Sequence, residues 1–208
     1  RHDAVAMAAT MAVVLFVGVE AGIMTGVVLS LLLFLWRTSR PHVAIVGLVP
    51  QSEHFRNVDR HRVLVSDKVL GIRVDESLYF ANARALEDRI YAEIAARPSL
   101  SHVVLMCPAV NLIDASALES LEAIQHRLKD AGVTFHLSEV KGPVMDALRR
   151  SDFLDHLQAG GGRIFLSQFE AISTLDPTLP SGRRADGSPA PISEPCIGVD
   201  GAEVKAIA

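Results

Sequence analysis

In residues 102–121, HVVLMCPAVNLIDASALESL, the pattern of apolar side chains changes from that of a strand to that of a helix. The run 102–107 is continuously apolar and of strand length, as expected of a strand buried on both faces. The helix that follows places its leucines on one face and charged side chains on the other. The stretch therefore predicts a strand-to-helix joint, with Asp114 and Ser116 at the turn.

The joint carries the signature of a helix cap. Ser116 and Glu119 have the S-x-x-E spacing of a capping box, in which the serine hydroxyl accepts from the glutamate N–H and the glutamate reaches back. We therefore expect Ser116 to cap the helix, with Asp114 as its acidic neighbour. A nucleophilic Ser116 is disfavoured, because no G-x-S-x-G motif surrounds it and no histidine is placed to activate it.

Catalytic residues, metal sites and cofactors are not expected. His42, His54 and His61 lack metal-ligand spacing, and the sequence has no phosphate-binding loop. Cys107 ends an apolar strand and reads as inert core, and with Cys196 as the only other cysteine a reducing compartment is expected. A net charge of −4 gives no basic surface for nucleic acid. We expect neither an enzyme nor a nucleic-acid-binding protein.

Strand and helix patterns alternate between residues 67 and 176. VLGIRV and SLYF read as two short strands around Asp75-Glu76, and Asn82 stands where it would cap the next helix. Further pairs are the strand 133–137 with a helix from Gly142, and the strand 163–166 with a helix opened by the capping box SQFE. The alternation predicts an α/β domain over 67–176 with a mixed or mainly parallel sheet.

Two segments outside this domain lack a regular pattern. Residues 41–66 are weakly periodic and contain Gly47 and Pro50, so we expect a juxtamembrane linker. Residues 177–208 are rich in proline, glycine and serine and have almost no apolar periodicity. Such a segment buries too little surface to offset its ordering entropy, and we expect a disordered tail.

The first forty residues are a separate, apolar part of the chain. The run from Ala4 to Trp36 is too long for a signal peptide and contains one charge, Glu20, which divides it into two segments. We expect residues 1–40 to form the last transmembrane segments, as a short helical hairpin. Glu20 is then either a residue of the interfacial turn or a functional carboxylate within the membrane.

The end of this run predicts its orientation. Trp36 offers an interfacial anchor, and Arg37 and Arg40 follow it, so the residues after Pro41 are expected to face the cytoplasm. The chain opens on Arg1 rather than on methionine, and we therefore expect a portion of a longer protein.

Three stretches together resemble a STAS domain (sulfate transporter and anti-sigma factor antagonist). They are SLYFANARALEDRI (77–90), the opening stretch 102–121, and GPVMDALRRSDFLDHL (142–157). The upstream GVEAGIMTGVVLSLLLFLWRTSRPH (18–42) resembles the last membrane segments of SulP-type anion permeases.

The resemblance implies the C-terminal part of a secondary anion transporter of the sulfate, bicarbonate and dicarboxylate class. Its STAS domain would have a regulatory and assembly role on the cytoplasmic side of an integral membrane protein. The implied partners are the membrane domain of the same transporter, a second copy in a homodimer and a cytosolic regulatory protein.

A second function is implied by the anti-sigma antagonist branch. In that branch the joint reads Asp-Ser-Ser-Gly and its second serine is phosphorylated, which falls on Ser116 here. Ala115 and Ala117 depart from the motif, and Asp114 and Glu119 would repel a phosphate. A phosphorylation-gated signalling module is the alternative, although a soluble antagonist has no use for the apolar N-terminal run.

Overall fold

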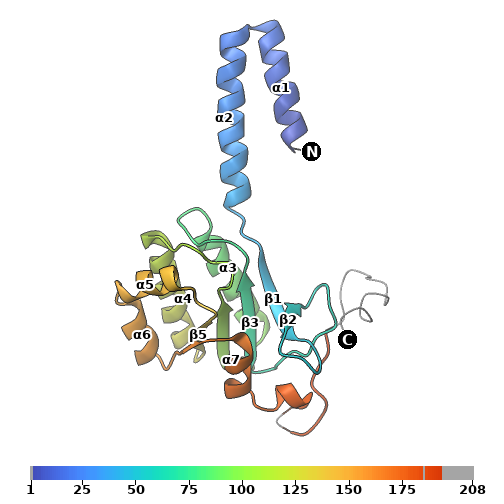
Figure 1. Cartoon of the computed structure of the whole chain (residues 1–208), viewed down its shortest axis with the longest axis vertical. Helices are drawn as coiled ribbons and strands as arrows, with labels where there is room; N and C mark the ends of the chain where they lie inside the picture. The colour runs from blue at the N-terminus through green and yellow to red at the C-terminus, as the bar shows by residue number, and fades with distance from the viewer. Residues whose placement is uncertain (1, 185, 194–208) are drawn as a thin grey trace. The chain divides into compact units, whose positions relative to one another are not determined.

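A computed structural model describes residues 2–184 and 186–193 of the chain. These residues fall into two compact units, one comprising residues 1–41 and the other beginning at His42. Figure 1 shows the helices and strands of both units in chain order. Each unit is described by itself.

The first unit is a helical hairpin, as predicted. Helix α1 (His2–Phe16) and helix α2 (Val19–Thr38) are joined at Gly18. The φ of Gly18 is 132°, a backbone conformation that residues other than glycine rarely adopt. The helices pack closely where Gly26 faces the Thr10 methyl group, at 3.1 Å from the position a Cβ would take. Within the described residues, α2 is the one helix long and apolar enough to cross a membrane, and α1 is shorter.

The second unit is built on one six-stranded sheet. Its strands are β1 (Val43–Leu48), β2 (Phe55–Asn57), β3 (Val69–Val74), β4 (His102–Met106), β5 (Thr134–Ser138) and β6 (Ile164–Phe165). They lie in the order β2-β1-β3-β4-β5-β6. Strands β3 to β6 are parallel, whereas β1 is antiparallel to both of its neighbours. The predicted α/β fold with a mixed, mainly parallel sheet is confirmed.

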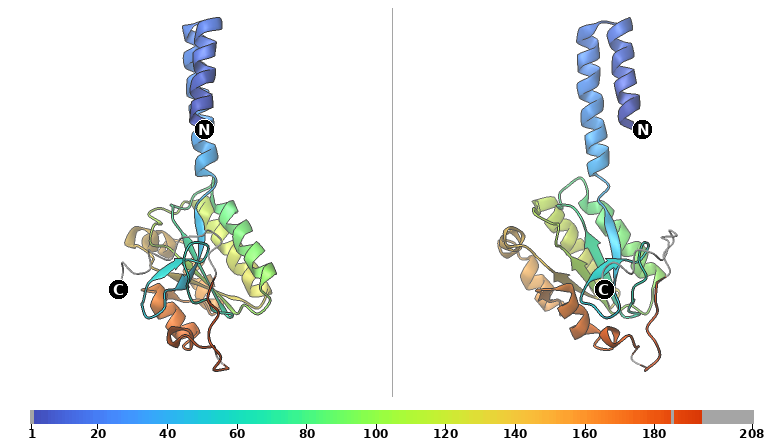
Figure 2. Two further views of the ribbon diagram at one scale, coloured as in Figure 1. Left: turned by 90° about the vertical axis from the view of Figure 1, so that its right-hand side faces the viewer. Right: turned by 45° about the vertical axis from the view of Figure 1, so that its right-hand side comes forward.

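Helices cover both faces of this sheet. They are α3 (Ala83–Ala96), α4 (Ala115–Asp130), α5 (Gly142–Arg149), α6 (Phe153–Ala159), α7 (Gln168–Leu175) and the short 3-10 helix η1 (Leu179–Ser181). One apolar core lies under α3 to α6, and a second lies under α7 and η1. Figure 2 shows α7 on the other side of the sheet from α3 and α4.

The predicted linker over 41–66 is wrong. Its first part is β1, a strand with five of six residues buried, and its second part holds β2. Leu48 also pairs with Leu64 in an isolated bridge. VAIVGL is an apolar run buried on both faces, but a glycine within it and a proline shortly after it made it resemble a linker in sequence. That glycine, Gly47, is required because a Cβ would stand 2.6 Å from the Leu64 carbonyl oxygen.

Two smaller predictions are also corrected. SLYF is a loop rather than a strand, and only Leu78 makes a bridge, with Ile113. The helix expected from Gly142 is two helices, α5 and α6, because the chain turns at Ser151, whose hydroxyl donates to the Leu148 carbonyl at 2.9 Å.

The predicted disordered tail is wrong for the part that the structure describes. Leu179 and Ala190 are buried in the second core, and Val65 and Ser193 donate backbone hydrogen bonds to Pro191 and Val63. Residues 194–208 lie outside the described residues.

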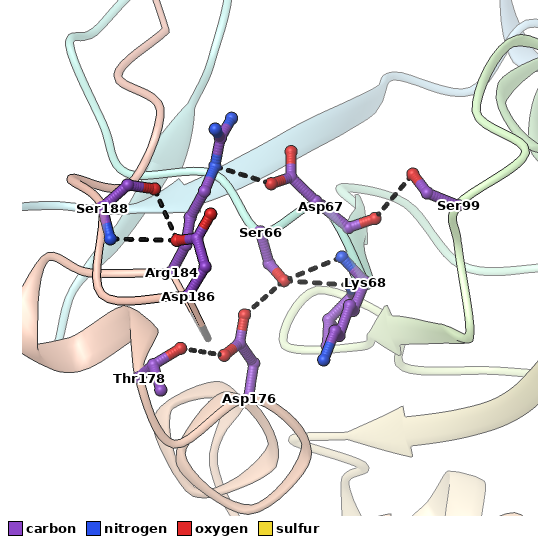
Figure 3. Close-up of polar contacts among 10 residues, drawn as sticks. Ser66, Asp67, Lys68, Ser99, Asp176, Thr178, Arg184, Asp186 and Ser188 are labelled. Atoms are coloured by element: carbon purple, nitrogen blue, oxygen red, sulfur yellow. Dashed lines mark hydrogen bonds and ion pairs between the residues drawn. The ribbon is translucent and has the colours of Figure 1, made fainter.

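Side-chain contacts hold the returning segment (Figure 3). The Ser66 hydroxyl donates to Asp176 at 2.6 Å, and Arg184 forms an ion pair with Asp67 at 2.8 Å. Hydrogen bonds and ion pairs of this kind therefore help to hold a segment whose sequence has no apolar periodicity.

Candidate functional site

The candidate site lies at the carboxyl edge of the parallel sheet. Strands β3, β4 and β5 end there side by side, and each continues into a loop that leads to a helix. The loop 107–114 joins β4 to α4 and ends in Asp114. Several polar side chains in these loops bind backbone or side-chain groups of a neighbouring loop.

Asp114, and not Ser116, caps helix α4. The Asp114 backbone is extended, and its Oδ1 accepts from the Ala117 N–H at 2.8 Å. A carboxylate at this position also interacts favourably with the positive end of the helix dipole. The prediction of a Ser116 cap is wrong because the helix begins at Ala115, one residue before the serine.

Asp114 joins two loops as well as capping a helix. Its Oδ2 accepts from the Phe80 N–H at 2.9 Å, and its own N–H donates to the Leu78 carbonyl at 3.3 Å. The Leu78 N–H donates in turn to the Leu112 carbonyl at 3.0 Å. One carboxylate therefore fixes the loop after β3 against the loop after β4.

Asn82 stabilises the loop after β3 from within. Its side chain is fully buried, accepts from the Tyr79 N–H at 3.0 Å and donates to the Ser77 carbonyl at 2.8 Å. Asn82 does precede α3, but its side chain makes no capping hydrogen bond to that helix. Its polar atoms are used to close the loop.

A third loop is linked to the second. Lys141, before α5, donates to the Asn111 side-chain oxygen at 2.7 Å, and the Asn111 N–H donates to the Ser77 hydroxyl at 3.3 Å. Sequence reasoning missed Asn111 and Lys141. Their signal is their position, since each lies in a loop that joins a strand of the parallel sheet to the next helix.

Ser116 and Glu119 lie on the exposed surface of the first turns of α4. Among the described residues, the Ser116 hydroxyl has no hydrogen-bond partner, no base contacts it, and Glu119 makes no return bond to the helix start. The serine is accessible for binding or modification. The site offers a surface and brings no nucleophile and base together.

Two apolar side chains accompany Ser116 at this edge. Phe80 is 68% exposed and Leu112 is 60% exposed, and both sit on the loops that Asp114 holds together. Sequence reasoning assigned Phe80 to a strand and did not single out Leu112. The loop 107–114 is itself mostly apolar in sequence, so Leu112 gave no signal of its exposure.

An ion-paired cluster stands where β1 begins. Asp75 accepts from Arg73 at 2.6 Å and contacts His42 Nδ1 at 2.7 Å. Partial burial acts to raise the pKa of Asp75, but hydrogen bonds from Arg73 and His42 outweigh it and hold that pKa below its ordinary value.

Cys107 and Glu20 complete the residues singled out from sequence. Cys107 is buried, and burial with the nearby Glu139 charge raises its pKa to about 12, so the thiol stays protonated as predicted for a core residue. Glu20 is exposed in the first turn of α2, two residues after Gly18. In the part of the chain that the structure describes, no group of His, Cys, Asp and Glu side chains could hold a metal ion.

Comparison with known proteins supports one family. The model of the STAS domain matches residues 61–171. Sulfate transporter 1.3 of Arabidopsis thaliana is 30% identical over 176 residues, which cover 80% of this chain and 26% of that protein. High affinity sulfate transporter 2 of Stylosanthes hamata is 27% identical over 187 residues, covering 85% of this chain and 28% of that protein. This chain therefore spans about a quarter of the length of these curated relatives.

Solved structures show the same fold. The inward-facing structure of the murine Solute Carrier 26 family member A9 anion transporter is matched with a TM-score of 0.72 at 17% identity, over 84% of this chain and 28% of that one. The relatives named here are transporters and not enzymes. The joint with Asp114, the mixed sheet and the family match agree, and the chain belongs to the STAS domain family, in the branch homologous to sulfate transporters.

Proposed function

We propose that this chain is part of a secondary anion transporter of the sulfate, bicarbonate or dicarboxylate class. One observation carries the proposal. The similarity to a sulfate transporter covers 80% of the chain, whereas the STAS domain match runs only from residue 61 to residue 171. The shared sequence thus extends beyond the domain. A STAS domain in the same chain as an apolar hairpin fits a permease better than a soluble antagonist.

We propose that the hairpin lies in a membrane and that the STAS domain is cytoplasmic. The α2 helix ends with Trp36 and Arg37, and the Arg40 guanidinium stands 5.4 Å from the Trp36 ring centre. Aromatic and basic residues at a helix end favour a membrane interface and the cytoplasmic side. Glu20 lies next to the hairpin turn, which favours an interfacial position for this carboxylate.

The domain then acts by contacts and not by chemistry. The described residues of its surface bring together a helix cap, braced loops and exposed apolar side chains, and this supports a regulatory and assembly role. A domain that contacts one state of the membrane domain better than the other shifts the population toward that state. Contacts with a second copy in a homodimer and with a cytosolic protein belong to the same proposal.

Transport by the complete protein tests this function. The complete transporter is reconstituted in proteoliposomes, and uptake of labelled sulfate is compared with that of a variant truncated after Pro41. We expect saturable uptake by the intact protein, competition by bicarbonate or a dicarboxylate that reveals the preferred anion, and an altered rate in the truncated one at equal membrane abundance. Absence of anion uptake by the intact protein would overturn the proposal.

A second candidate is a phosphorylation-gated module at Ser116. It is favoured by one observation, the exposed hydroxyl on the first turn of α4. The helix dipole would stabilise a phosphate there, whereas Asp114 would repel it. Mass spectrometry of the protein from its own cells decides the point: phosphate on Ser116 together with an altered Ser116→Asp transport rate supports the switch, and an unmodified Ser116 removes it.

A further inference from the structure

Exposed apolar side chains gather at one edge of the second unit. In the described part of this unit, the large hydrophobic side chains in solvent are Phe80, Leu112, Leu166 and Ile192. The first three follow the carboxyl ends of β3, β4 and β6. Because β3 to β6 are parallel, these ends lie at the same edge of the sheet. We call Phe80, Leu112 and Leu166 the apolar rim.

The rim residues stand on fixed backbone. The Phe80 N–H donates to Asp114, the Leu112 carbonyl accepts from Leu78, and the Leu166 N–H donates to the Glu170 carboxylate at 3.0 Å. Their positions are therefore set before any partner binds. Exposed apolar groups held on ordered loops mark interaction sites, because little further ordering is lost on binding.

The same edge receives the chain from the hairpin. Four residues separate the end of α2 at Thr38 from the start of β1 at Val43. Strand β1 is antiparallel to β3, and Val43 pairs with Val74, the last residue of β3. The chain therefore enters the domain at its carboxyl edge, the edge that carries the rim.

The charge of the loops at the carboxyl edge indicates which kind of partner they would bind. The loops 75–82, 107–114 and 139–141, which follow β3, β4 and β5, contain several carboxylates and a single cation, Lys141. The carboxylates are Asp75, Glu76, Asp114 and Glu139. Asp75 is paired with Arg73 and His42, Asp114 caps α4, and Glu139 accepts from the Gln168 N–H, which leaves Glu76 unpaired among the described residues of these loops. An anionic lipid surface would be repelled by this edge. Cytoplasmic loops of a membrane domain, which carry an excess of lysine and arginine, are complementary to it.

From these observations we infer that the apolar rim is the surface with which the STAS domain docks on lysine- and arginine-rich cytoplasmic loops of the transporter's membrane domain. Phe80 and Leu112 supply the apolar anchors, and Glu76, on the same loop as Phe80, pairs with a basic side chain. The inference rests on the proposed function and specifies the partner surface of the domain. Ser116, exposed on the helix that starts from the same loop, would lie at the border of this contact.

Photocrosslinking of the complete transporter in its native membrane tests the docking. The photoreactive p-benzoylphenylalanine replaces Phe80 in one variant and Leu112 in another, and the control places it at Ala131, an exposed position beyond the C-terminal end of α4. Crosslinked peptides are identified by mass spectrometry. We expect Phe80 and Leu112 to crosslink to basic cytoplasmic loops of the membrane domain and Ala131 not to do so.

Other crosslinking patterns contradict the inference. Crosslinks from Phe80 and Leu112 to lipid alone, to the STAS domain of a second copy or to a different protein would each overturn it, as would a pattern equal to that of Ala131. A transporter that takes up anions while its rim crosslinks only to lipid would refute the docking surface and leave the proposed function standing.

A charge variant sharpens the assignment. Glu76→Lys in the Phe80 crosslinking background reverses one carboxylate of the edge, and we expect the yield of loop crosslinks to fall by about threefold or more. An unchanged yield would show that the basic loops are not recognised through this charge, and the electrostatic part of the inference would fail. Circular dichroism of both proteins controls for folding.

Discussion

The two edges of the parallel sheet differ in how the polarity of their side chains matches the exposure of those side chains. At the carboxyl edge, Phe80 and Leu112 are apolar and exposed. Toward the amino edge, His136 in the middle of β5 is polar and only 1% exposed, and it contacts His102 at the start of β4 and Arg163 just before β6. The buried histidine has its hydrogen bonds satisfied within the chain, whereas the exposed apolar pair lacks cover from the described residues around it. The comparison shows that the amino edge satisfies its polar groups within the domain, whereas the carboxyl edge leaves apolar side chains in solvent.

The amino edge is complete because each ring nitrogen of His136 has a partner. Nδ1 accepts from the Arg163 N–H at 3.1 Å, so Nε2 carries the proton and donates to His102 Nδ1 at 3.2 Å. Burial, with the neighbouring His102 and Arg163, lowers the pKa of His136 to about 4. The imidazole is neutral and structural at physiological pH, and sequence reasoning gave no sign of this pair.

The free energy of unfolding of the second unit is the simplest measurement that distinguishes the two edges. Residues 42–193 hold both apolar cores, so the unit 42–208 is expected to fold alone, and its unfolding in urea is the measurement for the predictions that follow. Disruption of the amino edge should cost more than disruption of the carboxyl edge.

The largest effect is expected for Gly162→Ala at the amino edge. A Cβ at Gly162 would collide with the Phe135 carbonyl oxygen, and backbone cannot move aside cheaply. We expect a loss of about 3 kcal/mol. Gly142→Ala, at the carboxyl edge, is the matched control, because nothing lies within 4 Å of its Cβ position. Equal stability of the two variants would contradict the close packing of the amino edge.

Acid should act through His136. Its pKa of about 4 in the folded protein lies below the ordinary histidine value of 6.5, so the neutral form stabilises the fold fully above pH 6.5 and that contribution is lost as pH falls toward 4. We expect the free energy of unfolding to fall by about 2–3 kcal/mol over this range. His136→Gln should remove most of the slope, and the exposed His126→Gln should keep it. A slope that survives His136→Gln would refute this cause.

Asp114→Ala tests the brace of the carboxyl edge. The variant loses the α4 cap and the acceptor for the Phe80 N–H, and we expect a loss of about 1–2 kcal/mol in urea unfolding. Asp114→Asn keeps a good capping side chain and should lose less than about half of that. An unchanged free energy of unfolding in the Asp114→Ala variant would mean that the loops are held by other contacts.

The smallest effect is expected for Ser116→Ala. The serine is exposed, makes no capping bond and lies inside the helix, so stability should change by less than about 0.5 kcal/mol. A loss of about 1 kcal/mol would restore the serine as the cap and would contradict the assignment to Asp114.

The two capping boxes of the sequence show what pattern alone predicts. At Ser167 the S-x-x-E motif is confirmed: the serine accepts from the Glu170 N–H at 3.0 Å and caps α7. At Ser116 the same motif fails, because Asp114 stands two residues earlier and takes the position first. A motif gives the type of interaction, and competition between neighbouring candidates decides which residue makes it.

The alternation of strands and helices predicted the fold class, but not its border. Strands β3 to β5 are apolar runs of strand length between turn residues, helices α3 and α4 have helical periodicity, and a capping box marks the start of α7, so the sequence located them. Strand β1 is an apolar run like β4, but it was missed because Gly47 lies within it and Pro50 follows it closely. Residues 177–193 were missed because side-chain pairs such as Ser66–Asp176 hold them. The exposure of Phe80 and Leu112 depends on tertiary contacts and could not be read from their own segments.

Transport by a rim variant tests the central claim most directly. Labelled sulfate uptake is measured in proteoliposomes for the complete transporter carrying Phe80→Glu with Leu112→Glu, beside an Ile192→Glu control that places the same charge on an exposed apolar residue outside the rim. We predict that the double variant changes the uptake rate several-fold at unchanged folding and abundance, while the control does not. Equal uptake by the wild type, the double variant and the control would contradict the claim that the domain acts through its carboxyl edge.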